Sequence, residues 1–173
     1  YVPGYLVHHL GARRHYDPAD PVTFHIAELG NAPDYLASRV AYLLDLDGPA
    51  VGIQTSCSTG LVAIAEAVEA IRAGRCEMAL AGASSITFPQ GGYLAIDGHV
   101  GSPTGECRTF DATADGTVLG DGVVAIVLRR LDHARRDGNP ILAVVRGTAV
   151  NNDGAAKAGY SAPGVEGQTA VVA

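Results

Sequence analysis

The chain has no tryptophan, a single methionine and only three cysteines, Cys57, Cys76 and Cys107. An odd number of widely spaced cysteines argues against a disulfide framework and against metal ligation by C-x-x-C pairs. We therefore expect reduced thiols. The chain also starts at Tyr1 without an initiator methionine and stops inside a helix that has just begun, so we expect a segment of a longer polypeptide.

Basic residues are also scarce, with 12 Lys and Arg against 18 Asp and Glu and a net charge of −6. They are too scattered to form the positive surface typical of nucleic-acid binding, so nucleic acid is not expected as a partner. No apolar run approaches the ~20 residues that span a bilayer, and the first residues do not read as a signal peptide. The sequence thus predicts no membrane segment and a cytoplasmic location.

What is present is a pattern of alternating strands and helices in a chain whose 47% hydrophobic content can form a core. Residues 1–30 are broken by Pro and Gly and are expected to be loops with short ordered pieces. Apolar spacing predicts a helix over 31–46, capped by Asn31 or Asp34. A buried strand at 51–54, a helix at 58–73 closed by Gly74 and a strand at 77–82 predict a right-handed crossover with parallel strands.

The second half of the pattern continues the α/β alternation after a long loop. Predicted here are a strand at 122–131, a short helix at 132–137, a turn at 138–140, a strand at 141–150 and a helix starting near Val165. The loop at 84–120 is long enough to serve a site or an interface. Its apolar residues are expected to anchor it: Phe88, Tyr93, Leu94, Ile96 and Phe110. Gly116, Gly120 and Gly122 lack the Walker A pattern, so we expect turns into a strand and no nucleotide site.

Cys57 is the candidate nucleophile, in the stretch V-G-I-Q-T-S-C-S-T-G of residues 51–60. A thiol between a strand and a helix lies near the positive end of the helix dipole, which favours the thiolate that attacks carbonyl carbon. The neighbours of Cys57 are all small, so an acyl group can approach the sulfur and backbone N–H groups can face a developing oxyanion. The alternative interpretation is that Cys57 is buried and inert.

The other thiols and the histidines give weaker signals. Cys76 reads as a small core residue, and Cys107 as a structural residue whose pKa Arg108 could depress. None of the histidines has a site-like setting, and adjacent His8 and His9 would point apart, against a shared metal site. The full set is His8, His9, His15, His25, His99 and His133, of which His99 in the long loop is the one to test.

Five segments together resemble a β-ketoacyl synthase, specifically the ketosynthase domain of a bacterial modular type I polyketide synthase. They are G-P-A-V-G-I-Q-T-S-C-S-T-G-L-V-A-I at 48–64, C-E-M-A-L-A-G-A-S-S-I at 76–86, the glycine-studded 105–131, A-V-N-N-D-G at 149–154 and G-Y-S-A-P-G-V-E-G-Q at 159–168. The resemblance covers essentially all of residues 1–173, which would be a partial ketosynthase domain cut at both ends. Gly60, where Ser is frequent in the family, and Ser56, where Ala is common, are small departures.

The resemblance implies a thiolase-like fold, in which two α/β halves pack as five layers, and an acyltransferase that performs decarboxylative Claisen condensation. Cys57 would hold the growing acyl chain as a thioester, and its own N–H would contribute to the oxyanion hole. No metal or redox cofactor is implied, because the phosphopantetheine arm arrives on acyl carrier protein. The implied partners are that carrier, neighbouring polyketide synthase domains and a second copy that pairs through Val51, Gly52, Ile53 and Gln54.

Two features of the family are missing from this chain, the catalytic histidines of the H-G-T-G-T and N-I-G-H motifs and the second oxyanion donor. We therefore expect this chain alone to be inactive, with poor solubility because half of a two-half core leaves apolar faces uncovered. Three alternatives remain at this stage: a fatty-acid-type β-ketoacyl synthase, a non-condensing ketosynthase relative and, with little support, a cysteine hydrolase.

Overall fold

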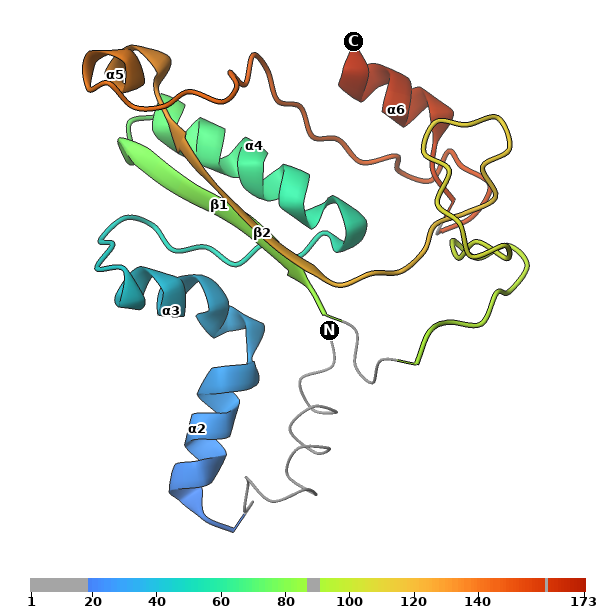
Figure 1. The fold of residues 1–173 in the computed structure, drawn as a ribbon, viewed down its shortest axis with the longest axis horizontal. Coiled ribbons are helices and arrows are strands. Elements are labelled where there is room, and N and C mark those ends of the chain that lie inside the picture. Colours follow the sequence, from blue (N-terminus) through green and yellow to red (C-terminus); the bar gives the residue numbers. More distant parts are fainter. Residues whose placement is uncertain (1–18, 87–90, 161) are drawn as a thin grey trace.

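The computed structural model describes residues 19–86, 91–160 and 162–173 (Figure 1). The elements in chain order are α2 (Pro21–Asn31), the 3₁₀ turn η2 (Pro33–Tyr35), α3 (Leu36–Leu43), the 3₁₀ turn η3 (Ser56–Ser58), α4 (Thr59–Arg72), β1 (Met78–Ser85), β2 (Gly122–Arg129), α5 (Leu131–Arg136) and α6 (Val165–Val172). These elements confirm the α/β class.

The centre of the described structure is a two-stranded antiparallel sheet with α4 lying along it. β1 pairs with β2 from Met78 opposite Arg129 to Ser85 opposite Gly122. In Figure 1, α4 lies beside this ribbon, and α3 and α2 lie on the other side. The predicted helix at 58–73 is thus confirmed as α4, and its end at Gly74 is explained by the left-handed φ of 71° that glycine adopts at low cost.

Two of the predicted strands are wrong. Residues 51–54 and 141–150 form no strand in the described structure. A strand needs a neighbour to supply its ladder of hydrogen bonds, and the only regular ladder among the described residues joins β1 to β2. The predicted parallel crossover around α4 is therefore also absent from this part of the chain, where the sheet is antiparallel.

The N-terminal helical region also differs from its prediction. α2 is a helix of 11 residues that begins at Pro21, in a range predicted to hold loops with short ordered pieces, and Ala32 interrupts the single helix predicted at 31–46. Pro33 explains the break, since the residue before a proline is pushed out of helical geometry, and Ala32 has an extended ψ of 131°. Neither Asn31 nor Asp34 is the residue that caps the following helices.

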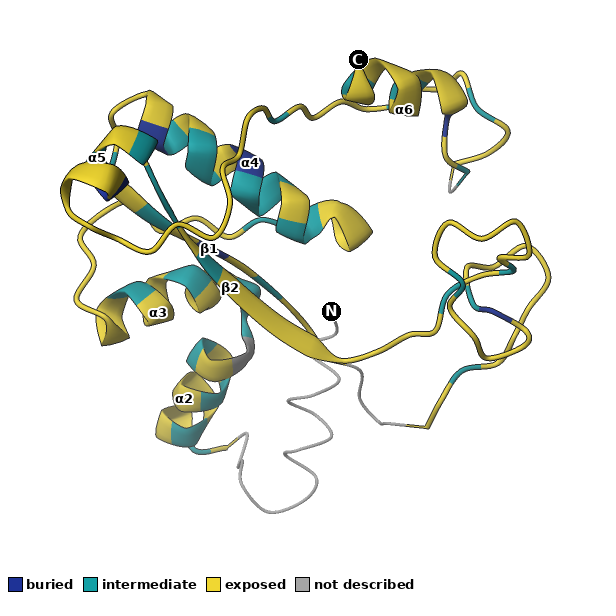
Figure 2. Ribbon diagram, turned by 45° about the horizontal axis from the view of Figure 1, so that its top comes forward, coloured by how far each residue is buried: buried dark blue, intermediate teal, exposed yellow. Residues whose placement is uncertain are grey.

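The buried core is small. Its apolar members are Ala65 and Ile71 of α4, Ala81 of β1 and Ala134 of α5. Figure 2 shows this burial concentrated where α4 faces the sheet, with exposed surface over most other elements. Leu61 of α4 is 75% exposed, and the apolar face of α3 is exposed as well.

Candidate functional site

Cys57 is the middle residue of η3, the tight turn that leads directly into α4. Its side chain is exposed, so the alternative of a buried, inert thiol does not describe this structure. The helix side of the predicted placement is confirmed, whereas the segment before the turn is extended chain and not a strand.

The environment of Cys57 is suited to negative charge. α4 is 14 residues long, and the positive end of its dipole faces the turn that holds Cys57. The side chain of Ser58, which precedes the helix, makes no capping bond to it. An acyl oxygen that gains charge during attack by the sulfur would therefore meet a favourable end of the helix.

The backbone ahead of Cys57 has an unusual conformation. Ser56 has a φ of 57°, in the left-handed region that residues with a side chain rarely adopt. Its hydroxyl oxygen lies 3.9 Å from the sulfur of Cys57. Such strained residues cluster at functional sites, where surrounding contacts hold them in place.

Gly60 allows this end of α4 to lie close to β1. A Cβ atom added at Gly60 would lie 3.3 Å from the Cβ of Ala83, which is tighter than an ordinary contact. The departure from the serine frequent at this position in the family therefore coincides with close packing of α4 on β1.

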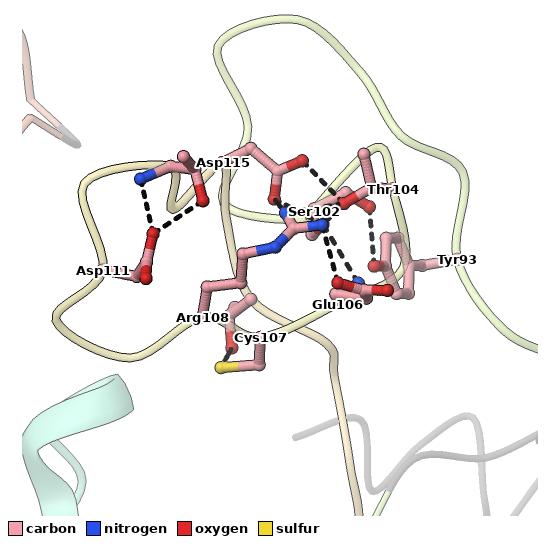
Figure 3. Close-up of polar contacts among 10 residues, drawn as sticks. Tyr93, Ser102, Thr104, Glu106, Cys107, Arg108, Asp111 and Asp115 are labelled. Carbon is pink, nitrogen blue, oxygen red and sulfur yellow. Dashed lines mark hydrogen bonds and ion pairs between the residues drawn. The ribbon is translucent and has the colours of Figure 1, made fainter.

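A second cluster of polar side chains organises the long loop (Figure 3). Ser102, 2% exposed, donates to Asp115 at 2.7 Å, and Thr104 donates to the other carboxylate oxygen at 2.7 Å. The hydroxyl of Tyr93 donates to the carbonyl of Ser102 at 2.8 Å. The hydrogen bonds from Ser102 and Thr104, with the charge of Arg108, lower the pKa of Asp115 below its ordinary value.

The predicted apolar anchors of this loop are largely wrong. Leu94, Ile96 and Phe110 are exposed, Phe110 fully so. Tyr93 is partly buried through its polar contact with Ser102, and Phe88 lies outside the described residues. Hydrogen bonds of Tyr93, Ser102, Thr104 and Asp115 connect the described part of this loop.

The other two cysteines are not part of the turn that holds Cys57. Cys76 is half-buried in the turn before β1, in keeping with a small packing residue. Cys107 is exposed, and hydrogen bonds from Thr117 and Thr109 and from the N–H of Val118 lower the pKa of its thiol. Arg108, predicted to have this effect, instead forms an ion pair with Glu106 at 2.6 Å.

The histidines that the structure describes lie apart. His25 of α2 faces Glu28 at 3.8 Å, His99 is exposed in the long loop, and the Nδ1 atom of His133 in α5 is buried without a partner. His8, His9 and His15 fall outside the described residues. In the part of the chain that is described, no group of three or more His, Cys, Asp or Glu side chains could hold a metal ion.

One open hollow of about 500 Å³ lies on the long loop, lined by residues 92–95, 102–105 and 118. Cys57 does not line it. The N-terminal end of α4 does face the side of the molecule where this loop lies, as both overall views show (Figures 1 and 2).

Two features of the structure have no counterpart in the sequence predictions. Asp20 followed by Pro21 is a typical helix start, and Asp20 indeed accepts hydrogen bonds from the N–H groups of Val22 and Thr23. The bonding of Ser102 to Asp115 spans 13 residues of irregular chain, for which no sequence periodicity gives a signal.

Comparison with known proteins identifies a family model and several relatives that match most of the chain. A family model described as the N-terminal domain of β-ketoacyl synthase matches residues 9–134. The chain is 44% identical over 177 residues to a phenolphthiocerol/phthiocerol polyketide synthase protein of Mycobacterium tuberculosis (strain ATCC 25618 / H37Rv), covering 98% of this chain and 12% of that protein. It is 52% identical over 134 residues to the hybrid PKS-NRPS synthetase TAS1 of Gloeophyllum trabeum, covering 77% and 9%.

The solved structures that resemble this chain are ketosynthases as well. Ketosynthase twelve of the bacillaene polyketide synthase of Bacillus amyloliquefaciens matches with a TM-score of 0.84 and 33% identity, over 90% of this chain and 28% of that one. The oxazolomycin ketosynthase domain OzmH KS7 of Streptomyces albus JA3453 matches with a TM-score of 0.70 and 37% identity, over 82% and 25%. The chain therefore spans about a tenth of these curated relatives and about a quarter of these solved chains.

None of the helices formed by the described residues combines the length and the apolarity that crossing a membrane requires. The family match over residues 9–134 and the likeness to solved ketosynthases confirm the thiolase-like fold class. This chain belongs to the β-ketoacyl synthase family, among the ketosynthases of polyketide synthases.

Proposed function

We propose that this chain supplies the nucleophile of a polyketide synthase ketosynthase, and that the nucleophile is Cys57. The observation that carries the proposal is the exposed thiol of Cys57 in the turn directly before α4, with small residues on both sides of it in the sequence. That arrangement allows a bulky acyl thioester to approach, and the positive end of α4 favours the charge that develops on its oxygen.

In the first half-reaction, the thiolate of Cys57 attacks the carbonyl carbon of an acyl thioester on the arm of acyl carrier protein. The new C–S bond to Cys57 forms as the C–S bond to the arm breaks, and the released arm takes up a proton as its thiol. In the second, a malonyl-type thioester loses carbon dioxide, and the resulting enolate carbon attacks the Cys57 thioester. A C–C bond forms, and Cys57 leaves as the thiolate.

The partners belong to the same proposal. In this proposal acyl carrier protein delivers both thioesters, further polyketide synthase domains are its neighbours, and the setting is the cytoplasm. We propose that two copies pair through Val51, Gly52, Ile53 and Gln54. This segment is extended, with Val51 65% exposed, and it makes no backbone hydrogen bond to another described residue. The chain carries neither histidine motif of the family, so the complete ketosynthase domain is the active unit.

The test is intact mass spectrometry of the complete domain after incubation with an acyl N-acetylcysteamine thioester. One acyl group should be added to the wild type and to Cys107→Ala, and none to Cys57→Ala. Cys107 is the matched control because its thiol is also exposed. An adduct that persists in Cys57→Ala, or one lost in Cys107→Ala alone, would refute the assignment. Loading at Cys57 without condensation with malonyl carrier would identify a non-condensing relative.

A further inference from the structure

The turn that carries Cys57 is closed by the side chain of a residue that follows it. The hydroxyl of Thr59 accepts a hydrogen bond from the N–H of Thr55 at 2.9 Å and donates one to the carbonyl of Ser56 at 2.8 Å. The N–H of Thr59 donates to the same carbonyl. A residue at the start of α4 therefore holds two backbone groups on the other side of Cys57.

These bonds act on the strained part of the turn. Ser56 has a φ of 57°, a conformation that persists only when neighbouring contacts hold it. The carbonyl that Thr59 holds belongs to the peptide between Ser56 and Cys57, so it fixes the direction in which the side chain of Cys57 leaves the backbone. Thr59 is half-buried, whereas Cys57 is exposed.

A second hydroxyl in the same turn provides a contrast. Ser58 donates to the carbonyl of Thr55 at 2.8 Å and lies 3.0 Å from the hydroxyl of Thr55. Its side chain makes no bond to Ser56 among those described, so its loss should leave the strained peptide in place. Ser58 is thus a control in the same turn, with a bond of the same length.

We propose that Thr59 is a positioning residue, whose hydroxyl holds the Ser56–Cys57 peptide in its left-handed turn and so aims the sulfur of Cys57 at an incoming acyl carbonyl. The proposal rests on the proposed function of Cys57 as nucleophile. It goes beyond that function in requiring a hydroxyl at position 59, since only a group that both donates and accepts can bridge the N–H of Thr55 and the carbonyl of Ser56.

The experiment compares three variants of Thr59 in the complete ketosynthase domain. Thr59→Val keeps the shape and loses the hydroxyl, Thr59→Ser keeps the hydroxyl, and Thr59→Ala lacks both the hydroxyl and the methyl group. We expect Thr59→Val and Thr59→Ala to lower the maximal rate of acyl loading at least tenfold while the KM for the acyl N-acetylcysteamine thioester stays within twofold. Thr59→Ser and Ser58→Ala should stay within threefold of the wild-type rate.

The Ser and Ala variants decide the matter even if Thr59→Val fails to fold, because they differ only by the hydroxyl. Equal loading rates in these two variants, or a rise in KM with an unchanged maximal rate, would overturn the proposal. Alkylation by iodoacetamide provides a second readout, with Cys107 as reference in the same digest. We expect the ratio of alkylation at Cys57 to that at Cys107 to fall at least threefold in Thr59→Ala and to be restored in Thr59→Ser.

This second readout separates the two hypotheses. A wild-type domain that acquires no acyl group at Cys57 would refute the proposed function, yet the alkylation ratio would still report whether Thr59 holds the turn. An unchanged ratio in Thr59→Ala, in a wild type that does load Cys57, would refute the positioning role alone.

Discussion

Ser102 and Asp115 are joined by a hydrogen bond of 2.7 Å that ties two distant parts of the long loop together. Ser102 is 2% exposed, and its hydroxyl also accepts from the N–H of Glu106 at 3.3 Å. Removing the hydroxyl would leave a carboxylate oxygen and an N–H group without this partner, which typically costs about 1–3 kcal/mol.

We therefore predict that Ser102→Ala lowers the free energy of unfolding of the complete domain by about 1–3 kcal/mol, as measured in urea. Hydrogen exchange should localise the effect to the N–H of Thr117, which donates to the carbonyl of Val100 at 2.8 Å. Ser85→Ala is the control, because its exposed hydroxyl makes a long bond of 3.5 Å, and it should change the stability by less than about 0.5 kcal/mol. Equal effects of the two substitutions would contradict this role of Ser102.

Gly116 and Gly120 lie in the same loop but differ in the space around them, so they provide a second test and control. Gly116 has a φ of 145°, and a Cβ atom added there would lie 2.6 Å from the backbone nitrogen of Ser102. Nothing lies within 4 Å of a Cβ added at Gly120. We expect Gly116→Ala to destabilise the domain by about 2–4 kcal/mol and Gly120→Ala by less than about 1 kcal/mol, measured by denaturant unfolding. A tolerated alanine at Gly116 would mean that the loop has another conformation.

Asp137 should make stability depend on pH. Its hydrogen bonds with Arg136, at 2.8 Å, and with Arg129 lower its pKa to about 2. A carboxyl group whose pKa is lowered in the folded state stabilises that state above its ordinary pKa of 3.8, and this contribution is lost as the pH falls toward 2. The stability advantage of the wild type over Asp137→Asn should therefore be smaller at pH 3 than at pH 5. An advantage that is equal at the two pH values would contradict this.

The apolar side chains exposed on the described residues predict how this chain behaves by itself. Phe110 and Leu142 are fully exposed, and Leu94 is 87% exposed. Apolar surface on this scale is typical of interfaces and causes association. We expect the isolated chain to bind an apolar dye such as ANS and to scatter light as its concentration rises, and the complete domain to do neither. A monomeric isolated chain that binds no dye would show that these side chains find cover.

The features that the sequence predicts well depend on local chemistry. Helix α4 is set by apolar spacing and by the need for glycine at position 74, where φ is positive. The strands at 77–82 and 122–131 and the short helix at 132–137 are found within a few residues of β1, β2 and α5. The turn that contains Cys57 is likewise a local feature, whereas the catalytic role of Cys57 stays a prediction.

The features that the sequence predicts wrongly, or does not predict, depend on neighbours distant in the sequence. Residues 51–54 and 141–150 have the composition of strands, but strand formation requires a pairing segment, which composition cannot supply. The network of Ser102 and Asp115 likewise joins residues that follow no period. The family resemblance added the thiolase-like fold to the α/β class that the sequence pattern predicts, while the contact of Thr59 with Ser56 required coordinates.

The end of helix α4 at Gly74 also bears on the direction from which a substrate can reach Cys57. With 14 residues, α4 is about 21 Å long, so its two ends lie far apart along the face of the sheet that it covers. The return of the chain into β1 occupies one end, and the sulfur of Cys57 lies at the other. Under the proposed function, a flexible arm carrying a thioester would enter at the end of α4 opposite that connection, and a cross-linker placed on the arm should label residues near the turn at 55–58 and spare those at 73–77.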